Sequence, residues 1–266
     1  MTDAATTKYE AIRYEQADGV ATITLNRPDV HNAMNQAMRR ELLEVFTRLR
    51  TDDTVRAVVV TGGGDKAFSA GADIREFLEP PVPTQFREAR RRVDFRREME
   101  RCPQPIIAAI RGYAFGGGLE LALACDIRLA ASHASFALPE ARWGGPPGAG
   151  GPVRLPMLVG RARALEIVCT GRELDAAELE RLGLVLAVHP ADRLLAEAQA
   201  LAARIAASGP LATRGAKRII STRLLAGFGE ARALSDTLRH AFEWSHDVDE
   251  GAAAHREGRG PRFTGR

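Results

Sequence analysis

The strongest constraint on how this chain can fold lies in residues 111–126, RGYAFGGGLELALACD. Three consecutive glycines separate an apolar run from a run rich in leucine and alanine. Because glycine has no side chain, its backbone tolerates positive φ and lets another molecule approach within contact distance. Helix-forming residues follow, with apolar positions at Leu119, Ala122 and Leu123, so we expect the glycines to open a helix.

The start of this expected helix offers a place for negative charge. A helix N-terminus presents unpaired N–H groups and a partial positive charge. Glu120 lies in the first turn, in otherwise apolar surroundings. The pattern predicts a backbone site for an oxygen that becomes negative, with a carboxylate beside it. A simpler explanation is open, in which the glycines form a turn or a tight helix contact and Glu120 only favours the helix dipole.

Strand and helix patterns alternate over about the first 190 residues. Alternating β-branched residues in 9–14 and 20–25 predict a hairpin. Asn35 is suited to cap a helix that runs to about Arg50. This alternation predicts an α/β fold with a βα-repeating core. The further strands are expected at 55–61, 105–110, 126–131, 134–137 and 184–188.

Only helical patterns follow the last of these strands. They are expected at 192–207, 211–225 and 230–256. We therefore divide the chain into a core that carries the site, residues 1–190, and a C-terminal helical region, residues 191–266. The helical region is expected to serve packing or oligomerisation rather than chemistry.

The composition is typical of a soluble globular protein, with 45% hydrophobic and 27% charged residues among 266. Cys102, Cys125 and Cys169 form no C-x-x-C pair, which predicts free thiols in a reducing compartment. The six histidines show no ligand spacing, so no metal is expected. No apolar run is long enough to cross a membrane, and the first residues lack a signal-peptide pattern, so the expected location is cytoplasmic.

The net charge of +3 is mildly basic. Nucleic-acid binding calls for clustered basic residues with interleaved aromatic ones. Residues 88–101, EARRRVDFRREMER, come nearest to this, but acidic residues interrupt the arginines, and a solvated helix face is expected. The same charge could attract a small phosphorylated ligand.

Two more loops have accessible backbone. Residues 67–74, AFSAGADI, repeat the order of a strand, a small-residue loop and a helix start. Residues 144–152, GGPPGAGGP, are almost entirely glycine and proline. Such a loop either moves freely or lets its backbone press against a ligand.

Four motifs stand in order along the chain: AFSAGADI, GYAFGGGLELALACD, FALPEARWG and PGAGGPVRLP. Together they resemble the enoyl-CoA hydratase/isomerase family, the crotonase superfamily, over nearly the whole chain. The resemblance implies a spiral of ββα repeats followed by helices that drive trimerisation, as a trimer or a dimer of trimers. It also implies an acyl-CoA thioester substrate and no cofactor, because coenzyme A is part of the substrate.

The resemblance assigns roles to backbone groups. By motif match, the N–H groups of Ala72 and Gly117 hold the thioester oxygen, which becomes an enolate oxyanion during the reaction. Preorganised donors in a dry site stabilise such charge without reorganisation. Further residues that the resemblance places at the substrate are Ala70, Asp73, Ile74, Gly116, Arg27, Trp143 and Phe263.

Two carboxylates decide which reaction of the family is expected. Hydratases of this family carry one glutamate just after the glycines and one in a Pro-Glu step, which match Glu120 and Glu140. Hydration needs a base that activates water at C3 and an acid that protonates C2. We assign Glu120 to the water and Glu140 to proton transfer at C2, and their repulsion should keep one of them protonated. Outside this context, Glu140 would be a surface carboxylate at a strand end.

The chain departs from the family pattern at a few positions. Pro152 stands where hydratases usually carry threonine, and Trp143 and the prolines at 146–147 lie where the acyl chain should run. In the tail, Thr264 stands where lysine is common, so Arg262 or Arg27 would have to replace one phosphate contact. Asp73 is interpreted mainly as a helix-starting residue and Asp126 as a tie for a loop.

Three alternatives are open. The motifs are especially similar to the carnitinyl-CoA dehydratase branch, which uses the same pair of glutamates. Isomerisation of a 3-enoyl-CoA to a 2-enoyl-CoA needs a single carboxylate, and Glu120 argues against it. One branch of the family also binds AU-rich RNA, and in this chain such binding would depend on Arg90, Arg91 and Arg92.

Overall fold

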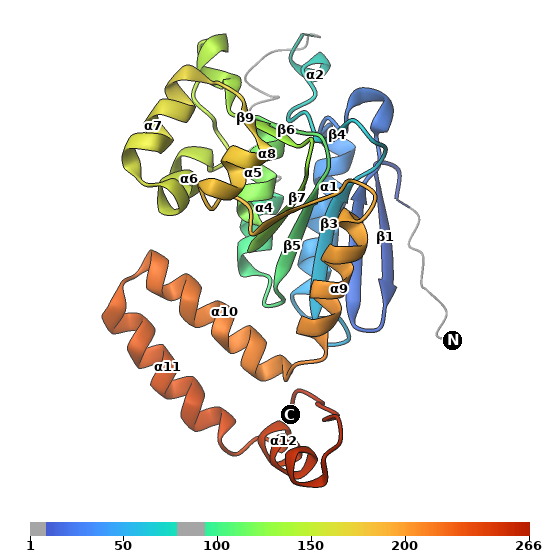
Figure 1. Cartoon of the computed structure of the whole chain (residues 1–266), viewed down its shortest axis with the longest axis vertical. Helices are drawn as coiled ribbons and strands as arrows, with labels where there is room; N and C mark the ends of the chain where they lie inside the picture. The colour runs from blue at the N-terminus through green and yellow to red at the C-terminus, as the bar shows by residue number, and fades with distance from the viewer. Residues whose placement is uncertain (1–8, 79–93) are drawn as a thin grey trace.

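The computed structural model describes residues 9–78 and 94–266, and it contains two sheets (Figure 1). The larger sheet has six strands in the order β1-β2-β3-β5-β7-β10. Its strands are β1 (Ile12–Ala17), β2 (Val20–Leu25), β3 (Ala57–Gly62), β5 (Ile106–Ile110), β7 (Ile127–Ala131) and β10 (Ala187–His189). The smaller sheet consists of β4 (Ala67–Ser69), β6 (Tyr113–Phe115), β8 (Ser135–Ala137) and β9 (Leu174–Asp175).

The strands follow one another as repeats. In the pairs β3–β4, β5–β6 and β7–β8, the first strand joins the larger sheet and the second joins the smaller one. Pairing is parallel except in the hairpin β1–β2 and in β8–β9. Helix α5 (Gly117–Ala124) follows β6 directly. The expected α/β spiral of ββα repeats is confirmed.

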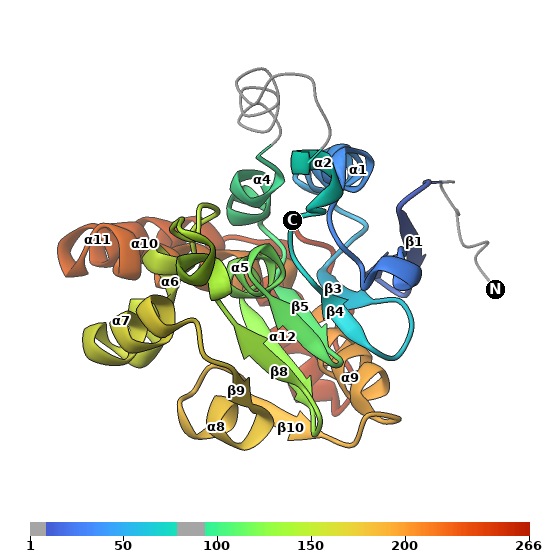
Figure 2. The ribbon, with the colours of Figure 1, turned by 90° about the horizontal axis from the view of Figure 1, so that it is seen from above.

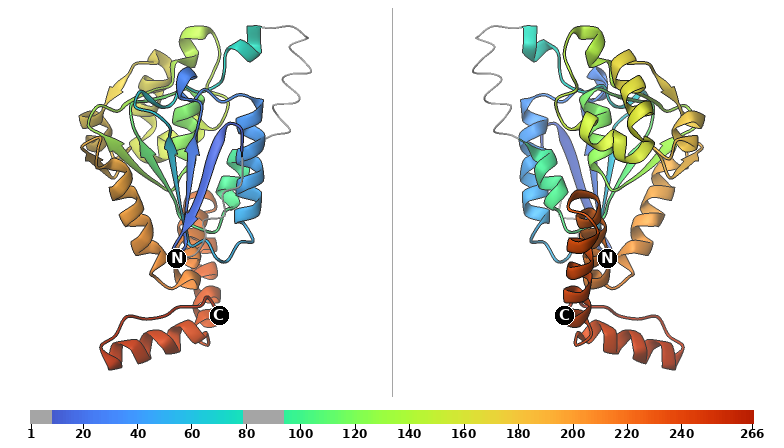
Figure 3. Two further views of the ribbon diagram at one scale, coloured as in Figure 1. Left: turned by 90° about the vertical axis from the view of Figure 1, so that its right-hand side faces the viewer. Right: turned by 90° about the vertical axis from the view of Figure 1, so that its left-hand side faces the viewer.

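The larger sheet is buried on both faces, since its central strands alternate between two apolar layers. Val58 and Val60 of β3 belong to the main core, whereas Val59 belongs to a second layer. Figures 2 and 3 show α1 (Gln36–Leu49) and α4 (Phe95–Arg101) on one side of the strands and α9 (Leu194–Ala206) on the other. Burial on both faces explains the continuous apolar runs in these strands.

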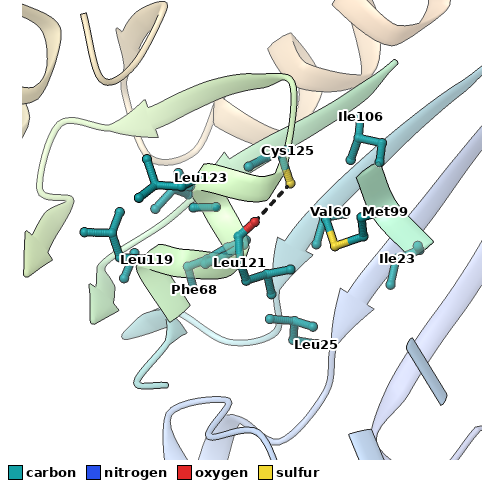
Figure 4. Packing of buried hydrophobic residues seen from close by; sticks show 14 of the residues in the cluster. Ile23, Leu25, Val60, Phe68, Met99, Ile106, Leu119, Leu121, Leu123 and Cys125 are labelled. Carbon is teal, nitrogen blue, oxygen red and sulfur yellow. Dashed lines mark hydrogen bonds between the residues drawn. The ribbon is translucent and has the colours of Figure 1, made fainter. Parts of the chain in front are cut away.

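The main core brings together side chains from distant parts of the chain. Figure 4 shows Ile23 of β2, Val60 of β3, Met99 of α4 and Leu121 of α5 in one layer, and all four are buried. Asn35 caps α1 by accepting a hydrogen bond from the Met38 N–H, as its position in the sequence predicts. This packing fixes the positions of α4 and α5, and the candidate site lies at the start of α5.

Shorter helices lie between the strands along the chain. They are η1 (Pro28–Val30), α2 (Arg75–Leu78), η2 (Pro139–Trp143), α6 (Gly151–Val159), α7 (Arg161–Thr170) and α8 (Ala176–Arg181). Among the described residues, no helix combines the length and apolar character needed to cross a bilayer.

The last three helices extend away from the sheets (Figures 1 and 3). They are α10 (Pro210–Leu225), α11 (Phe228–Phe242) and α12 (His246–Glu257). The single helix expected at 230–256 is wrong, because Ser245 caps a new helix by accepting a hydrogen bond from the Val248 N–H. The division at residue 190 stays a prediction, and α9, which follows it, packs on the larger sheet through Leu194 and Ala198.

Candidate active site

Two backbone N–H groups lie side by side at the start of α5. Met34 accepts a hydrogen bond from the Asp73 N–H and donates one to the Gly71 carbonyl, so the N–H of Ala72 between them points away from Met34. Gly117 is the first residue of α5. A Cβ placed on Gly117 would lie 3.6 Å from the Ala72 nitrogen. Neither N–H donates a hydrogen bond to any other group within the described residues.

Glycine is required where the loop after β4 approaches this helix start. Gly71 has φ +93°, and a Cβ on it would lie 2.7 Å from the Phe115 carbonyl oxygen and 3.0 Å from the Gly117 nitrogen. A Cβ on Gly118 would overlap the carbonyl of Ser69. The glycines therefore allow the close approach that places the two N–H groups together.

Two polar residues that the motif analysis missed hold this loop. The buried Asn32 side chain donates to the carbonyls of Gly63 and Ala67 at 2.9 and 2.8 Å. The Ser69 hydroxyl donates to the Asn32 carbonyl at 2.9 Å and accepts from the Gly71 N–H at 3.2 Å. Buried polar groups satisfied in this way restrict the backbone to one arrangement.

Asp73 is occupied by two arginines. It pairs with Arg75 at 2.8 Å and with Arg27 at 2.9 Å. Hydrogen bonds from Arg75 and then from Arg27 outweigh burial and hold the pKa of Asp73 well below its usual range. The carboxylate therefore stays charged and fixes the chain just after Ala72, in agreement with its interpretation as a mainly structural residue.

The Glu120 carboxylate is held by the glycine-rich loop. Its side chain is buried, and Oε1 accepts hydrogen bonds from the N–H groups of Ala149 and Gly151 at 2.7 and 2.9 Å. Gly151 also begins α6, and Pro152 occupies its first turn. Proline is well suited there, because N–H groups of the first turn have no partner within the helix. The loop backbone thus presses against a carboxylate of the protein itself.

Glu140 lies in a different environment. Its Oε2 is buried without a hydrogen-bond partner in the described part of the chain. Its Oε1 would lie 2.8 Å from a Cβ placed on Gly116, the residue before α5. Burial raises the pKa of Glu140; a backbone hydrogen bond opposes this, and the negative charge of Glu120 adds to it. The site therefore holds two carboxylates in different environments, and that of Glu140 raises its pKa above the usual glutamate value.

The arrangement can stabilise an oxyanion and exchange protons near it. No cluster of metal-ligating side chains occurs in residues 9–78 and 94–266. The N–H pair and the two carboxylates offer electrostatic stabilisation and acid–base transfer.

The family model described as enoyl-CoA hydratase/isomerase matches residues 15–266. The chain belongs to this family. A Mycobacterium tuberculosis protein named "Probable enoyl-CoA hydratase echA8" is 40% identical over 97% of this chain and 99% of its own length. A carnitinyl-CoA dehydratase of Citrobacter koseri is 37% identical, with 97% and 99% covered. The crystal structure of an enoyl-CoA hydratase from Bacillus anthracis superposes with a TM-score of 0.93 at 38% identity, covering 97% of this chain and 100% of the other.

Crotonase superfamily membership, inferred from four motifs, is thus confirmed. Most of the residues assigned to the site by motif match lie around the N–H pair. Gly116 caps α5 and Gly117 begins it, and Ala70, Ala72 and Ile74 belong to the loop after β4, with the Ile74 side chain 62% exposed. Their individual roles stay predictions.

Two assigned residues lie apart from the others. Trp143 ends η2 and is 81% exposed. Phe263 packs beside Gly209 and Gly251, and its carbonyl accepts a hydrogen bond from Arg56 at 2.7 Å. In Figure 1 the C-terminus lies at the opposite end of the molecule from α2. Their contacts with a substrate stay predictions.

Proposed function

We propose that this protein catalyses the reversible hydration of a 2-enoyl-CoA to a 3-hydroxyacyl-CoA. The observation that carries the proposal is the placement of two carboxylates, Glu120 and Glu140, around the start of a helix that also presents the N–H pair of Ala72 and Gly117. Membership of the family and the names of its relatives support enoyl-CoA hydration.

The N–H pair holds the thioester oxygen. As the C2=C3 bond takes up water, negative charge moves onto this oxygen, and the two donors stabilise the resulting enolate. Their availability supports this role, because neither N–H is used within the described residues. Alanine and glycine suit the task, since only the main chain has to contact the oxygen.

The two glutamates divide the remaining chemistry. Glu120 holds and activates the water whose oxygen bonds to C3, and Glu140 supplies the proton that bonds to C2. The unequal environments of the carboxylates support this division. Glu120 accepts two backbone hydrogen bonds, whereas burial favours a proton on Glu140. Dehydration follows the same steps in reverse.

A carnitinyl-CoA dehydratase-like activity is the second candidate, favoured by the relative from Citrobacter koseri. It uses the same reaction class with a different acyl group. Isomerisation of a 3-enoyl-CoA is the third candidate, and it needs only one carboxylate.

The substrate is an acyl-CoA thioester, and no further cofactor is proposed. We also propose a homotrimer or a dimer of trimers, assembled through the C-terminal helices. Exposed apolar side chains on α10 and α11 support this assembly: Ile220, Leu224, Leu225 and Phe228.

A cytoplasmic location fits the free cysteines. The arginines at 90–92, on which RNA binding would depend, lie outside the described residues, and nucleic-acid binding is not proposed.

Three acyl-CoA substrates discriminate between the candidates. Purified protein is incubated with crotonyl-CoA, with the unsaturated carnitine-derived thioester and with a 3-enoyl-CoA. We expect water addition to crotonyl-CoA, measured as loss of the conjugated-thioester absorbance and as formation of 3-hydroxybutyryl-CoA. Turnover of the carnitine-derived thioester alone would favour the second candidate. Conversion of the 3-enoyl-CoA without any hydration would contradict the proposed function.

A further inference from the structure

An arginine of α4 lies beside the N–H pair. Nη2 of Arg96 donates a hydrogen bond to the Gly117 carbonyl at 2.8 Å. The same atom would lie 3.5 Å from a Cβ placed on Gly117, and the Ala72 nitrogen would lie 3.6 Å from that Cβ. The guanidinium also lies 4.5 Å from the ring centroid of the buried Phe95, which restricts its position.

Arg96 differs from its neighbours in the arginine-rich segment. The sequence pattern predicts a solvated helix face, and Arg97 and Arg101 are exposed as expected. Arg96 is only partly exposed and faces the start of α5. The solvated face therefore does not account for this residue.

The position of this charge is unusual for a helix start. The N-terminus of a helix already carries partial positive charge, so cations are normally favourable at the opposite end. A guanidinium at the start of α5 becomes favourable when negative charge develops there.

We propose that Arg96 is a positioning residue, which orients the first peptide of α5 through the Gly117 carbonyl and adds positive potential at the Ala72 and Gly117 N–H groups. It acts through Gly117 and does not contact the substrate. The proposal rests on the proposed function, because the charge that it stabilises is the thioester enolate. Stabilisation of this charge lowers the barrier to hydration.

Acetoacetyl-CoA tests the electrostatic role without turnover. Its enolate carries the same negative oxygen and absorbs in the near ultraviolet. The pH dependence of this absorbance, with the ligand bound, reports how strongly the site favours the enolate. Four proteins are compared: the wild type, Arg96→Gln, Arg96→Lys and the matched control Arg97→Gln, which removes an exposed charge from the same helix.

We expect Arg96→Gln to raise the apparent pKa of the bound acetoacetyl group by about one unit and to lower kcat for hydration by about tenfold, with little change in KM. Arg96→Lys should keep the apparent pKa of the bound acetoacetyl group near its wild-type value, because it keeps the positive charge. Arg97→Gln should behave as the wild type.

If Arg96→Gln leaves the apparent pKa of the bound acetoacetyl group unchanged, the proposal is overturned, whatever the loss of activity or stability. Arg96 then has a purely structural role. Equal shifts in Arg96→Gln and Arg97→Gln would overturn it as well. Wild type that binds the enolate but does not hydrate crotonyl-CoA would contradict the proposed hydratase activity, while the ligand measurement would still decide the role of Arg96. If the wild type does not favour the enolate of bound acetoacetyl-CoA, the result contradicts both the role of Arg96 and the proposed hydratase activity.

Discussion

At the scale of single residues, the site depends on a difference between two carboxylates. Glu120 is held by two N–H groups of the loop before α6, whereas Oε2 of Glu140 is buried without a partner among the described residues. Environments that separate two acidic groups in this way allow one to act as the acid and the other as the base at the same pH.

The raised pKa of Glu140 makes stability depend on pH. The folded protein binds this proton more tightly than the unfolded chain, so the free energy of unfolding should fall as pH rises from the usual glutamate pKa through the raised one. In Glu140→Gln this fall should be absent. Urea unfolding between about pH 4 and pH 7 measures the difference.

The control for this measurement is Glu15→Gln, which changes an exposed carboxylate of β1. It should keep the wild-type dependence on pH. Identical pH dependence in the wild type and in Glu140→Gln would show that burial does not shift this carboxyl group.

Sequence motifs identified the candidate residues whose chemistry is carried by a short pattern, such as Glu120 after the glycines. They did not identify Asn32, Ser69 or Arg96. These side chains bind backbone groups that are distant in sequence, as in the hydrogen bond from Arg96 to the Gly117 carbonyl. No local spacing encodes such a contact, so it became visible only once the fold brought the segments together.

At the scale of elements, the site depends on the contact between the loop after β4 and the start of α5. A Cβ on Gly118 would overlap the Ser69 carbonyl, and a Cβ on Gly71 would lie 2.7 Å from the Phe115 carbonyl oxygen. Both contacts involve backbone on each side, which cannot move aside as a flexible side chain can. The positions of the two N–H donors are therefore linked to the absence of side chains at these glycines.

Gly118→Ala should separate the two elements. We expect a loss of about 2 kcal/mol or more in the free energy of unfolding and a fall of at least about 10²-fold in the hydration rate, because one oxyanion donor is displaced. Gly148→Ala is the control, since a Cβ there meets no atom within 4 Å. Urea unfolding and the hydration assay measure both effects. A normal rate in Gly118→Ala would contradict the link between this contact and the donors.

Helix boundaries show where local patterns stop being informative. The glycine- and proline-rich stretch was expected to be a loop up to Pro152, yet α6 begins at Gly151 because proline fits the first turn of a helix. The apolar pattern at 230–256 continues across Ser245, where a hydrogen bond from the Val248 N–H starts a new helix.

At the scale of the whole molecule, the C-terminal helices are attached to the sheets through charged contacts. Lys217 of α10 donates to the Gln104 carbonyl at 2.9 Å and pairs with Asp126 at 2.7 Å. Asp126 also accepts a hydrogen bond from the Ile106 N–H at 2.7 Å, so it ties a loop as its position predicts. These bonds join α10 to the segment just before β5 and to the segment between α5 and β7.

Lys217→Met should weaken this attachment. Hydrogen bonds to charged groups contribute about 1.5–3 kcal/mol, and Lys217 is only 12% exposed, so we expect a loss of about 2 kcal/mol in the free energy of unfolding. Arg232→Gln breaks an exposed pair with Asp236 and should change stability by less than about 1 kcal/mol. Hydrogen exchange should locate the faster opening in α10. Equal losses in the two variants would contradict a special role for Lys217.

The measurement that tests the central claim most directly is crotonyl-CoA hydration by the wild type, Glu120→Gln and Glu140→Gln, with Glu15→Gln as the control. If the two carboxylates handle water and proton, each substitution at the site lowers kcat by about 10²–10⁴-fold or more, while the variants remain folded and the control keeps wild-type activity. Hydration that survives both substitutions would contradict the assignment of Glu120 and Glu140 to the reaction.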